Sequence, residues 1–385
     1  MRISHVITKG DVGGAQTNVV ELASAQVRAG DDVVVTAGSD GPALERAAAA
    51  GARVELVPEV VAAREGGGSL RSAYGALAAR LGDIAPDVVH GHSSHAGLLA
   101  RAASRRLGLP SVYTAHGWPF QPGAPWRQRV SSYAGETVGA WLGDVVICLT
   151  ESEARAARWV VPSSRMRIVP NGIADVSADE LRPSGRSADG PVRLVMVARF
   201  APPKQQAALL QALADVADVA WELTFVGEGP GRTACEQIAA ARFGDGRVSF
   251  AGHRDDVPAL LARHDVAVLW SGYEGMPMAL LEGMRAGLCC LANDLPGVRV
   301  LFGTDHDLEP AGVIADADGL PELVRRWADD RDDLDRWGQR ARQRYLDAFT
   351  ADAMAAAVRQ AYDDAIARRP LIGRRRGPGG GTSAR

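Results

Sequence analysis

Two carboxylates eight residues apart, Glu274 and Glu282, flank a Gly/Pro-containing turn and an otherwise apolar run in the segment EGMPMALLE. The pattern predicts Glu274 in a loop and Glu282 more than one turn inside a helix. A carboxylate in apolar surroundings must find a partner or lose its charge, so a solvated helix face explains Glu282 poorly. The N–H groups of Met278, Ala279 and Leu280 at the helix start would bind an anion.

A second pair of residues, Arg199 and Lys204, lies between a predicted strand over 193–197 and a predicted helix over 205–214. A guanidinium and an ammonium at the carboxyl end of a strand can converge on a diphosphate. Two surface cations on a loop are the alternative. The position of the loop favours the diphosphate site.

A third candidate is the segment TKGDVGGAQ over 8–16, between the first predicted strand and the first predicted helix. Gly13 and Gly14 let backbone N–H groups approach a ligand, and the helix N-terminus favours an anion such as phosphate. A tight strand-to-helix turn explains these glycines equally well when they are taken alone.

Three histidines follow another predicted strand in the order His90, His92 and His95. This spacing resembles the H-x-H-x-x-H motif of binuclear metallohydrolases, in which histidines bind zinc. Ser94 stands where that motif carries an Asp. A metal-dependent hydrolase is therefore an open alternative.

The elements that must position these residues alternate along the chain, which predicts an α/β fold with parallel sheets covered on both faces. Predicted strands are 3–7, 33–36, 53–56, 88–90, 111–114, 145–149, 167–169, 193–197, 221–226, 248–250, 266–270 and 288–292. Predicted helices are 15–29, 43–50, 70–81, 96–107, 127–141, 152–159, 205–214, 233–241, 257–263, 278–286, 335–349 and 351–366.

The alternation lapses once, over 173–191, where Asp, Ser, Gly and Pro replace the apolar period. We therefore expect a Rossmann-like domain over 1–172, a linker over 173–191 and a second such domain over 192–349. A helix over 350–367 would cross back to the first domain, and 368–385 would be a disordered basic tail. Ligands of such sheets bind beyond the carboxyl ends of the strands, so the two domains would enclose a cleft.

Composition indicates an ordinary folded chain: of 385 residues, 46% are hydrophobic and 23% are charged. The net charge is −3 and the tail holds six Arg without an acid, so the remainder carries −9 and nucleic acid is not an expected partner.

The scattered Cys148, Cys235, Cys289 and Cys290 indicate small buried side chains in a reducing compartment. No apolar run is long enough for a signal peptide or a spanning helix. We expect a cytoplasmic protein that contacts the inner face of the membrane at most peripherally.

Taken together, the motifs closely resemble those of retaining glycosyltransferases of family 4, which have the GT-B fold. The resemblance runs in the right order over 3–362, and Arg-x4-Lys followed by Glu-x7-Glu is far more specific than any glycine loop. The motifs that carry it are Gly13-Gly14, His116-Gly117-Trp118, Arg199 with Lys204, VGEGP over 226–230, and Glu274 with Glu282.

The resemblance implies a UDP-sugar or GDP-sugar donor on the C-terminal domain and a glycan or lipid-linked acceptor on the N-terminal domain. Its implied role is in cell-surface polysaccharide or glycolipid biosynthesis, with no cofactor, no metal and no protein nucleophile. Arg199 and Lys204 would neutralise the leaving diphosphate. Glu282 would bind the ribose hydroxyls, Glu274 a donor-sugar hydroxyl, and His116 the sugar near the reacting carbon. The implied catalytic residues are His116, Arg199, Lys204 and Glu274.

The same resemblance implies further donor contacts. Backbone from Gly275 to Leu280 would meet the sugar and the phosphates, and Gly13 and Gly14 would lie beside the diphosphate. The loop with His253 and Arg254 would meet the base. The implied donor-binding residues are Gly13, Gly14, Arg199, Lys204, His253, Arg254, Gly275, Met276, Pro277, Met278, Ala279, Leu280 and Glu282.

This sequence also departs from the family pattern at three positions, with Gln205 for a common Gly, Val300 for a Glu and Gln16 for a Glu. The last two weaken the transfer of sugar contacts to 295–299 and of acceptor contacts to the first loop. A sugar-nucleotide-binding protein without turnover is the second open alternative, beside the hydrolase.

Some residues could also serve the acceptor. A basic face could meet anionic lipid or a pyrophosphate-linked acceptor, with a solvated helix face as the alternative. Trp118 and Trp126 could be platforms for the acceptor, or could only pack the loop. The residues of that basic face are Arg101, Arg105, Arg106, Arg127 and Arg129.

Overall fold

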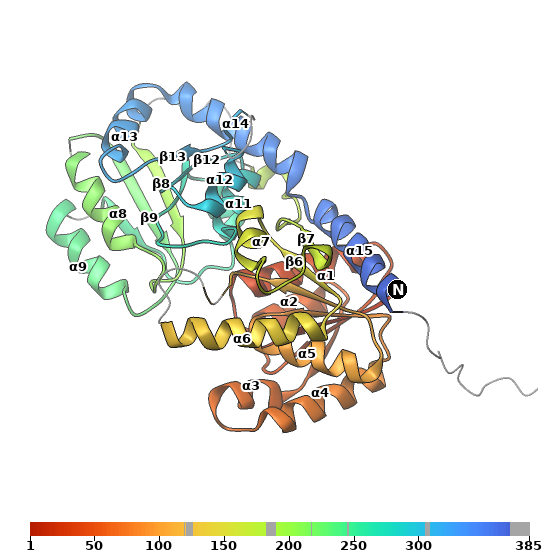
Figure 1. Ribbon diagram of the computed structural model, residues 1–385. Helices are drawn as coiled ribbons and strands as arrows, with labels where there is room; N and C mark the ends of the chain where they lie inside the picture. The colour runs from red at the N-terminus through yellow and green to blue at the C-terminus, as the bar shows by residue number, and fades with distance from the viewer. Residues whose placement is uncertain are drawn as a thin grey trace, which may run out of the picture.

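The computed structural model describes residues 1–118, 120, 126–181, 190–216, 218–244, 246–304 and 309–369 and contains two parallel sheets with helices around each (Figure 1). The strands are β1 (Arg2–Ile7), β2 (Asp32–Ala37), β3 (Arg53–Leu56), β4 (Val88–His92), β5 (Ser111–Ala115), β6 (Val145–Cys148), β7 (Met166–Ile168), β8 (Val192–Val197), β9 (Trp221–Val226), β10 (Val248–Phe250), β11 (Val266–Leu269), β12 (Cys289–Ala292) and β13 (Val313–Ile314). The α-helices are α1 (Gly14–Arg28), α2 (Pro42–Ala49), α3 (Pro58–Glu65), α4 (Leu70–Ile84), α5 (Ser94–Leu107), α6 (Trp126–Leu142), α7 (Glu151–Ala157), α8 (Gln206–Leu213), α9 (Arg232–Phe243), α10 (Val257–Leu261), α11 (Met278–Arg285), α12 (Pro296–Phe302), α13 (Leu320–Asp329), α14 (Arg331–Ala348) and α15 (Ala351–Arg368).

The N-terminal sheet has seven strands in the order β3-β2-β1-β4-β5-β6-β7, all parallel. Its inner strands are buried on both faces, which suits the short β-branched and apolar runs that predicted them. The order reverses between β1 and β4, where Ile3 is in register with Val88. Loops that leave the sheet on either side of such a reversal open a crevice for a ligand.

The C-terminal sheet has six strands in the order β10-β9-β8-β11-β12-β13, also all parallel. Here the order reverses between β8 and β11, with Leu194 in register with Val266. The loop with Arg199 follows β8 and the loop with Glu274 follows β11. The topology therefore brings the two strongest motifs of the sequence to one crevice. The predicted fold class, two Rossmann-like α/β domains, is confirmed.

Helix α15 packs on the N-terminal sheet, although α14 before it belongs to the second domain (Figure 1). Its buried Met354, Val358 and Tyr362 contact the core around Val88 and Val145. The crossing point is fixed by backbone hydrogen bonds from the Ile173 N–H to the Phe349 carbonyl and from the Ala351 N–H to the Ile173 carbonyl, at 3.0 and 2.8 Å. The chain thus passes between the domains twice at one place.

The structure differs from the predicted linker and from some of the predicted elements. The segment over 173–191 starts with a buried residue, Ile173, and residues 182–189 lie outside the described part, as does the tail from 370. Helices α3 and α12 and strand β13 have no counterpart among the predicted elements. The run PGVRVLF of α12 is apolar almost throughout and begins with Pro-Gly, which indicated a turn, yet Pro is well tolerated at the first helical position.

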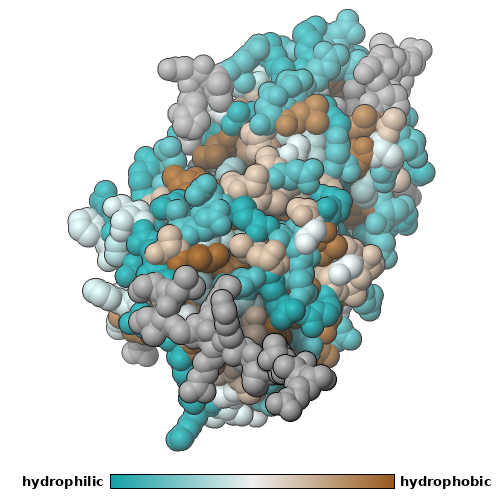
Figure 2. All heavy atoms as spheres, turned by 90° about the vertical axis from the view of Figure 1, so that its right-hand side faces the viewer, coloured by the Kyte–Doolittle hydropathy of each residue, from teal (hydrophilic) through white to brown (hydrophobic). Residues whose placement is uncertain are grey.

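Arg101 does not belong to a basic surface, so that part of the predicted face is wrong. Its side chain is 1% exposed, lies over the Tyr113 ring and donates to Glu136 at 2.9 Å. Arg105 and Arg106 are exposed, while the side chains of Arg127 and Arg129 lie outside the described part of the structure. Figure 2 shows the face where α15 lies, with hydrophobic residues in small groups between hydrophilic ones.

Two further predictions from composition can be compared with the structure. The four cysteines are free and buried, as expected. Within the described ranges, no helix combines the length and the apolar character that crossing a bilayer requires.

Candidate active site

The first turns of α1 and α11, one from each domain, lie against each other across the cleft. A Cβ placed on Gly14 would be 3.7 Å from Cγ of Met278. Both helices begin without a side-chain cap at the N-terminus, after Gly13 and Pro277 respectively, so the first backbone N–H groups remain available. Two helix N-termini at one place favour a group with two negative charges, as a diphosphate has.

The loop before α11 is held against the N-terminal domain. A Cβ on Gly275 would be 3.8 Å from the N–H nitrogen of Gly117, and a Cβ on Gly117 would be 3.6 Å from Oη of Tyr273. The Asn171 side chain donates to the Met276 carbonyl at 3.3 Å. His116, which precedes Gly117, therefore lies beside the loop that carries Glu274.

Lys204 and Glu274 form a close ion pair, with Nζ 2.5 Å from Oε1 and with 20% and 13% of the side chains exposed. The Lys204 backbone forms a bridge to Ser271, which ties the loop after β8 to the loop after β11. Arg199 is exposed, and its guanidinium has no ion-pair partner among the residues that the structure describes. One cation is thus fixed by a carboxylate and the other is available to an incoming anion.

Glu282 lies in the second turn of α11 with part of its side chain at the surface. Burial raises its pKa, and the nearby Arg285 opposes that shift. Glu21 and Arg46, both from the N-terminal domain, also influence its charge. Glu282 is therefore close enough to the N-terminal domain to be influenced by its charges.

The loop with His253 and Arg254 is exposed and joins the same edge of the C-terminal sheet. The Gly227 N–H donates to the Gly252 carbonyl at 2.7 Å, and the Phe200 N–H donates to the Glu228 carbonyl at 2.9 Å. The loops after β8, β9 and β10 are therefore linked in a row. The Arg254 guanidinium already has a partner, because two of its nitrogens donate to Asp256 at 2.7 and 2.6 Å.

The remaining donor-loop residues differ in how accessible they are. Met278 and Ala279 are half-buried, whereas Met276, Pro277 and Leu280 are buried and belong to the wall of the site. Any contact from these buried residues to a ligand has to come from their backbone. Trp118 is also buried: it stacks on Phe120 and donates to the Glu153 carbonyl at 3.0 Å, so it packs the loop.

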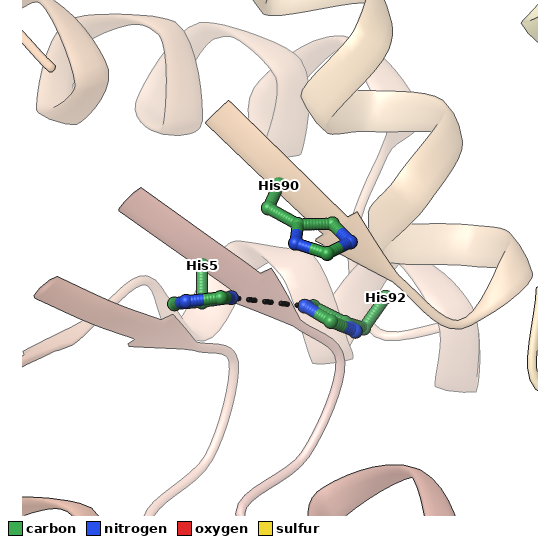
Figure 3. A group of neighbouring side chains, drawn as sticks. All are labelled: His5, His90 and His92. Atoms are coloured by element: carbon green, nitrogen blue, oxygen red, sulfur yellow. Dashed lines mark hydrogen bonds between the residues drawn. The ribbon is translucent and has the colours of Figure 1, made fainter. Parts of the chain in front are cut away.

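A buried histidine cluster, only part of which was considered from the sequence, supports His116 from behind. His116 Nε2 is 3.1 Å from His92 Nδ1. Behind it, His92 Nε2 is 3.0 Å from His5 Nδ1, the contact drawn as a dashed line in Figure 3. Burial lowers the pKa of both His5 and His116 to about 4, and lowers that of His92 well below its usual value. All three imidazoles are therefore neutral at pH 7.

The zinc motif that was the alternative for His90, His92 and His95 is not the group that the structure brings together. In the described part of the chain, the group of histidine, cysteine and acidic side chains that could together hold a metal is His5, His90 and His92, with ligand atoms within 4.8 Å (Figure 3). His95 is not part of it. Every ring nitrogen of these three already has a hydrogen-bond partner, including Tyr362 and Thr114 for His90. A bound metal would have to displace those bonds, so the residues fit a hydrogen-bonded core better than a metal centre.

Glu153 is a further acid at this site that the sequence reading missed. It is 3% exposed, Oε1 has no hydrogen-bond partner, and Oε2 accepts from the Leu149 N–H at 2.9 Å. A Cβ on Gly275 would be 2.6 Å from Oε1, so the carboxyl group lies directly under the donor loop. Burial raises its pKa to about 7. The available signal was Thr150 three residues earlier, a helix N-cap that marks the start of α7.

A cavity of about 900 Å³ also lies between the domains. None of the predicted donor-site residues lines it, so it is not the donor site described above. Its walls come from the loop into α7, from the segment around β7 and from the start of α12. They comprise Leu149, Thr150, Glu151, Ser152, Arg155, Ile168, Pro170, Asp294, Pro296, Arg299 and Val300.

Comparison with known proteins agrees with this architecture. Residues 13–172 match the family described as glycosyl transferase 4-like domain, and residues 177–344 match glycosyl transferases group 1. The chain is 30% identical to the MMP alpha-(1->4)-mannosyltransferase of Mycolicibacterium hassiacum over 78% of its length and 75% of the relative's. It is 24% identical to the UDP-Gal:alpha-D-GlcNAc-diphosphoundecaprenol alpha-1,3-galactosyltransferase of Escherichia coli, over 73% of its length and 76% of the relative's.

Among solved structures, HepE of Anabaena in complex with UDP and glucose has a TM-score of 0.78 at 17% identity, and the match covers 94% of this chain and 99% of HepE. Sucrose-phosphate synthase of Thermosynechococcus elongatus has a TM-score of 0.77 at 20% identity, with 96% and 100% covered. The motifs, the two facing sheets and these matches agree, and the chain belongs to the family 4 glycosyltransferases with the GT-B fold.

Proposed function

We propose that this enzyme moves a sugar, with retention and without a metal, from a UDP-sugar or GDP-sugar to a glycan or lipid-linked acceptor. The observation that carries the proposal is the meeting of three features: the first turns of α1 and α11 lie against each other, Lys204 pairs with Glu274, and Gly275 beside Glu274 packs against Gly117, which follows His116. The UDP and glucose bound by HepE support the class of donor. The pathway would be the synthesis of a cell-surface polysaccharide or glycolipid.

The reaction breaks the bond between the sugar C1 and a diphosphate oxygen and forms a bond between C1 and an acceptor oxygen on the same face. The acceptor proton passes to the departing diphosphate. Negative charge grows on the leaving oxygen while positive charge grows on the sugar, so fixed cations and N–H groups near the diphosphate lower the barrier most. Lys204, Arg199 and the first turn of α11 have this role in the proposal.

Glu274 has two tasks in this scheme. It orients the Lys204 ammonium through their 2.5 Å contact, and it accepts a hydrogen bond from a hydroxyl of the donor sugar. Glu282 binds the ribose, His116 contacts the sugar near C1, and the loop with His253 lies toward the base. The division into 1–172 for the acceptor side and 192–349 for the donor side follows from this assignment.

A panel of UDP-sugars and GDP-sugars tests the proposal through release of nucleoside diphosphate, with and without EDTA. We expect turnover of one donor that resists EDTA, with the anomeric configuration of the product equal to that of the donor by NMR. Glu282→Ala should raise the donor KM and change kcat little. Activity lost in EDTA and restored by zinc would instead support the hydrolase, and binding without release would indicate a protein that has lost turnover.

We also propose that the acceptor is approached at a membrane surface. Helix α6 exposes Val130, Val138 and Trp141, the last with 73% of its surface exposed, and exposed Arg105 and Arg106 end the neighbouring α5. Apolar side chains beside cations suit an anionic bilayer. Co-sedimentation with phosphatidylglycerol vesicles should fall in Trp141→Ser. Equal recovery with and without vesicles would remove the membrane contact and leave the transfer reaction in place.

A further inference from the structure

Seven side chains form one unbroken hydrogen-bond chain through the core of the N-terminal domain to His116. They come from β1, β4, β5, the segment after β5, α1 and α15, and all but His116 are buried. In order, the bonds are Thr114 Oγ1 to His90 Nε2 (2.7 Å), His90 Nδ1 to Tyr362 Oη (2.8 Å), Tyr362 Oη to Gln26 Nε2 (3.1 Å), Gln26 Oε1 to His5 Nε2 (2.7 Å), His5 Nδ1 to His92 Nε2 (3.0 Å) and His92 Nδ1 to His116 Nε2 (3.1 Å).

The imidazoles in this chain are neutral, because burial lowers the pKa of each below the working range. A neutral imidazole has one N–H that donates and one bare nitrogen that accepts. Each ring in the chain must therefore donate at one end and accept at the other. The direction of any one bond then fixes the direction of all the others.

Gln26 sets this direction because its two amide atoms differ. Its oxygen faces His5 and can only accept, whereas its nitrogen donates to Tyr362. His5 must hold its proton on Nε2, which leaves Nδ1 bare to accept from His92. His92 in turn accepts on Nδ1 from the Nε2–H of His116.

We propose that Gln26, His5 and His92 are positioning residues that hold His116 as the Nε2–H tautomer and leave its Nδ1 bare. That nitrogen then accepts a hydrogen bond from a hydroxyl of the donor sugar. The sugar contact rests on the proposed transfer function, whereas the tautomer does not. Gln26, 90 positions upstream of His116 in the sequence and on helix α1, thereby selects which substrate group His116 can bind.

This hydrogen-bond network also accounts for the burial of the histidines, because hydrogen bonds alone satisfy their ring nitrogens. A buried polar network is stable only if each member is satisfied, and here the ring nitrogens of His5, His90 and His92 all have partners. Tyr362, which comes from α15, joins the two halves of the network. Because α15 crosses to the first domain, its Tyr362 can complete the network that holds the His116 ring.

Long-range ¹H–¹⁵N NMR of the full-length protein labelled on histidine distinguishes a protonated ring nitrogen from a bare one. Signals are assigned by single His→Gln substitutions. We expect His5, His92 and His116 each to carry the proton on Nε2. A bare Nε2 on His116 in the wild-type protein would overturn the proposal, and the substitutions serve only to assign its signals.

Gln26→Met removes the acceptor at similar volume, whereas Gln26→Glu keeps an oxygen facing His5. We expect Gln26→Met to mix the two tautomers of His116 and to lower kcat/KM by roughly tenfold, and Gln26→Glu to restore the Nε2–H tautomer. An unchanged His116 tautomer in folded Gln26→Met would overturn the role of Gln26. His95→Gln is the matched control, since His95 is not part of this hydrogen-bond network. It should change neither the His116 tautomer nor kcat/KM.

The two proposals fail in different ways. If the NMR result is as expected but no nucleotide sugar is turned over, the positioning chain stands and the transfer function is wrong. If donors are turned over while His116 carries its proton on Nδ1, the transfer function stands and the positioning chain is wrong.

Discussion

Replacing Glu153 by Gln removes one charge from the base of the donor loop with almost no change in volume. Burial raises the pKa of this carboxyl from 4.5 to about 7 because Oε1 is enclosed without a hydrogen-bond donor. The folded protein therefore binds the proton more tightly than the unfolded chain does. The stability that this proton contributes is present below pH 4.5 and is lost as the pH rises to about 7.

The size of the effect follows from the shift, since each pKa unit corresponds to about 1.4 kcal/mol. At pH 8 the wild-type protein should therefore be about 3 kcal/mol less stable than Glu153→Gln, and near pH 4.5 the two should differ by under about 1 kcal/mol. Gln still accepts from the Leu149 N–H through its amide oxygen, so the local hydrogen bond survives.

Thermal unfolding midpoints of both proteins at pH 4.5 and pH 8 provide the assay. All other titrating groups are shared, so they cancel in the difference between the two midpoints. We expect the variant to unfold several degrees higher at pH 8 and at nearly the same temperature at pH 4.5. Glu151→Gln, an exposed acid in the same helix, is the control and should show no such pH-dependent gain. A difference that is equal at both pH values, or absent at pH 8, would refute a buried, unpartnered carboxyl.

Three further outcomes are expected. Lys204→Ala should lower kcat by roughly 100-fold in the diphosphate-release assay, because the growing charge on the leaving oxygen loses the ammonium that the proposal assigns to it. Gly275→Ala should raise the donor KM, because its Cβ would be 2.6 Å from a buried carboxylate oxygen, whereas Gly272→Ala, at 3.4 Å from the nearest side chain, should not. Arg101→Met should lower the free energy of unfolding in urea by about 3–5 kcal/mol because Glu136 is left buried and unpaired, and adding Glu136→Gln should restore part of it.

The strands could be predicted from local patterns because all of them except β13 are short segments rich in β-branched or other apolar residues, with a turn or a helix on each side. Strand β13 pairs only two residues at the edge of its sheet, too few to leave a period in the sequence. Helix α15 was predicted as a helix, and its buried face is explained by the sheet that it covers. Arg101 was misread because a basic residue in a helix with Arg105 and Arg106 has the pattern of a solvated face, and only the approach of Glu136 makes burial favourable.

The loop motifs of the site were accessible from sequence because their chemistry is local: a cation or a glycine directly follows a strand. The support behind His116 was not, because it depends on which strands are neighbours. His5 and His92 meet only because β1 lies beside β4, and His90 meets Tyr362 across 272 positions of sequence. Glu153 likewise became a site residue only when the second domain placed Gly275 over it.

In the proposed reaction the two domains contribute groups of different charge. Around His116 the N-terminal domain offers neutral groups, since burial keeps this ring and those behind it uncharged at pH 7. The C-terminal domain offers the cations, with Lys204 oriented by Glu274 and Arg199 unpaired among the described residues. A positively charged His116 beside a sugar that gains positive charge would oppose the reaction, whereas a bare nitrogen that accepts a hydroxyl proton does not. The depressed pKa of His116 is therefore consistent with positioning, and stabilisation of the leaving group has to come from the C-terminal domain.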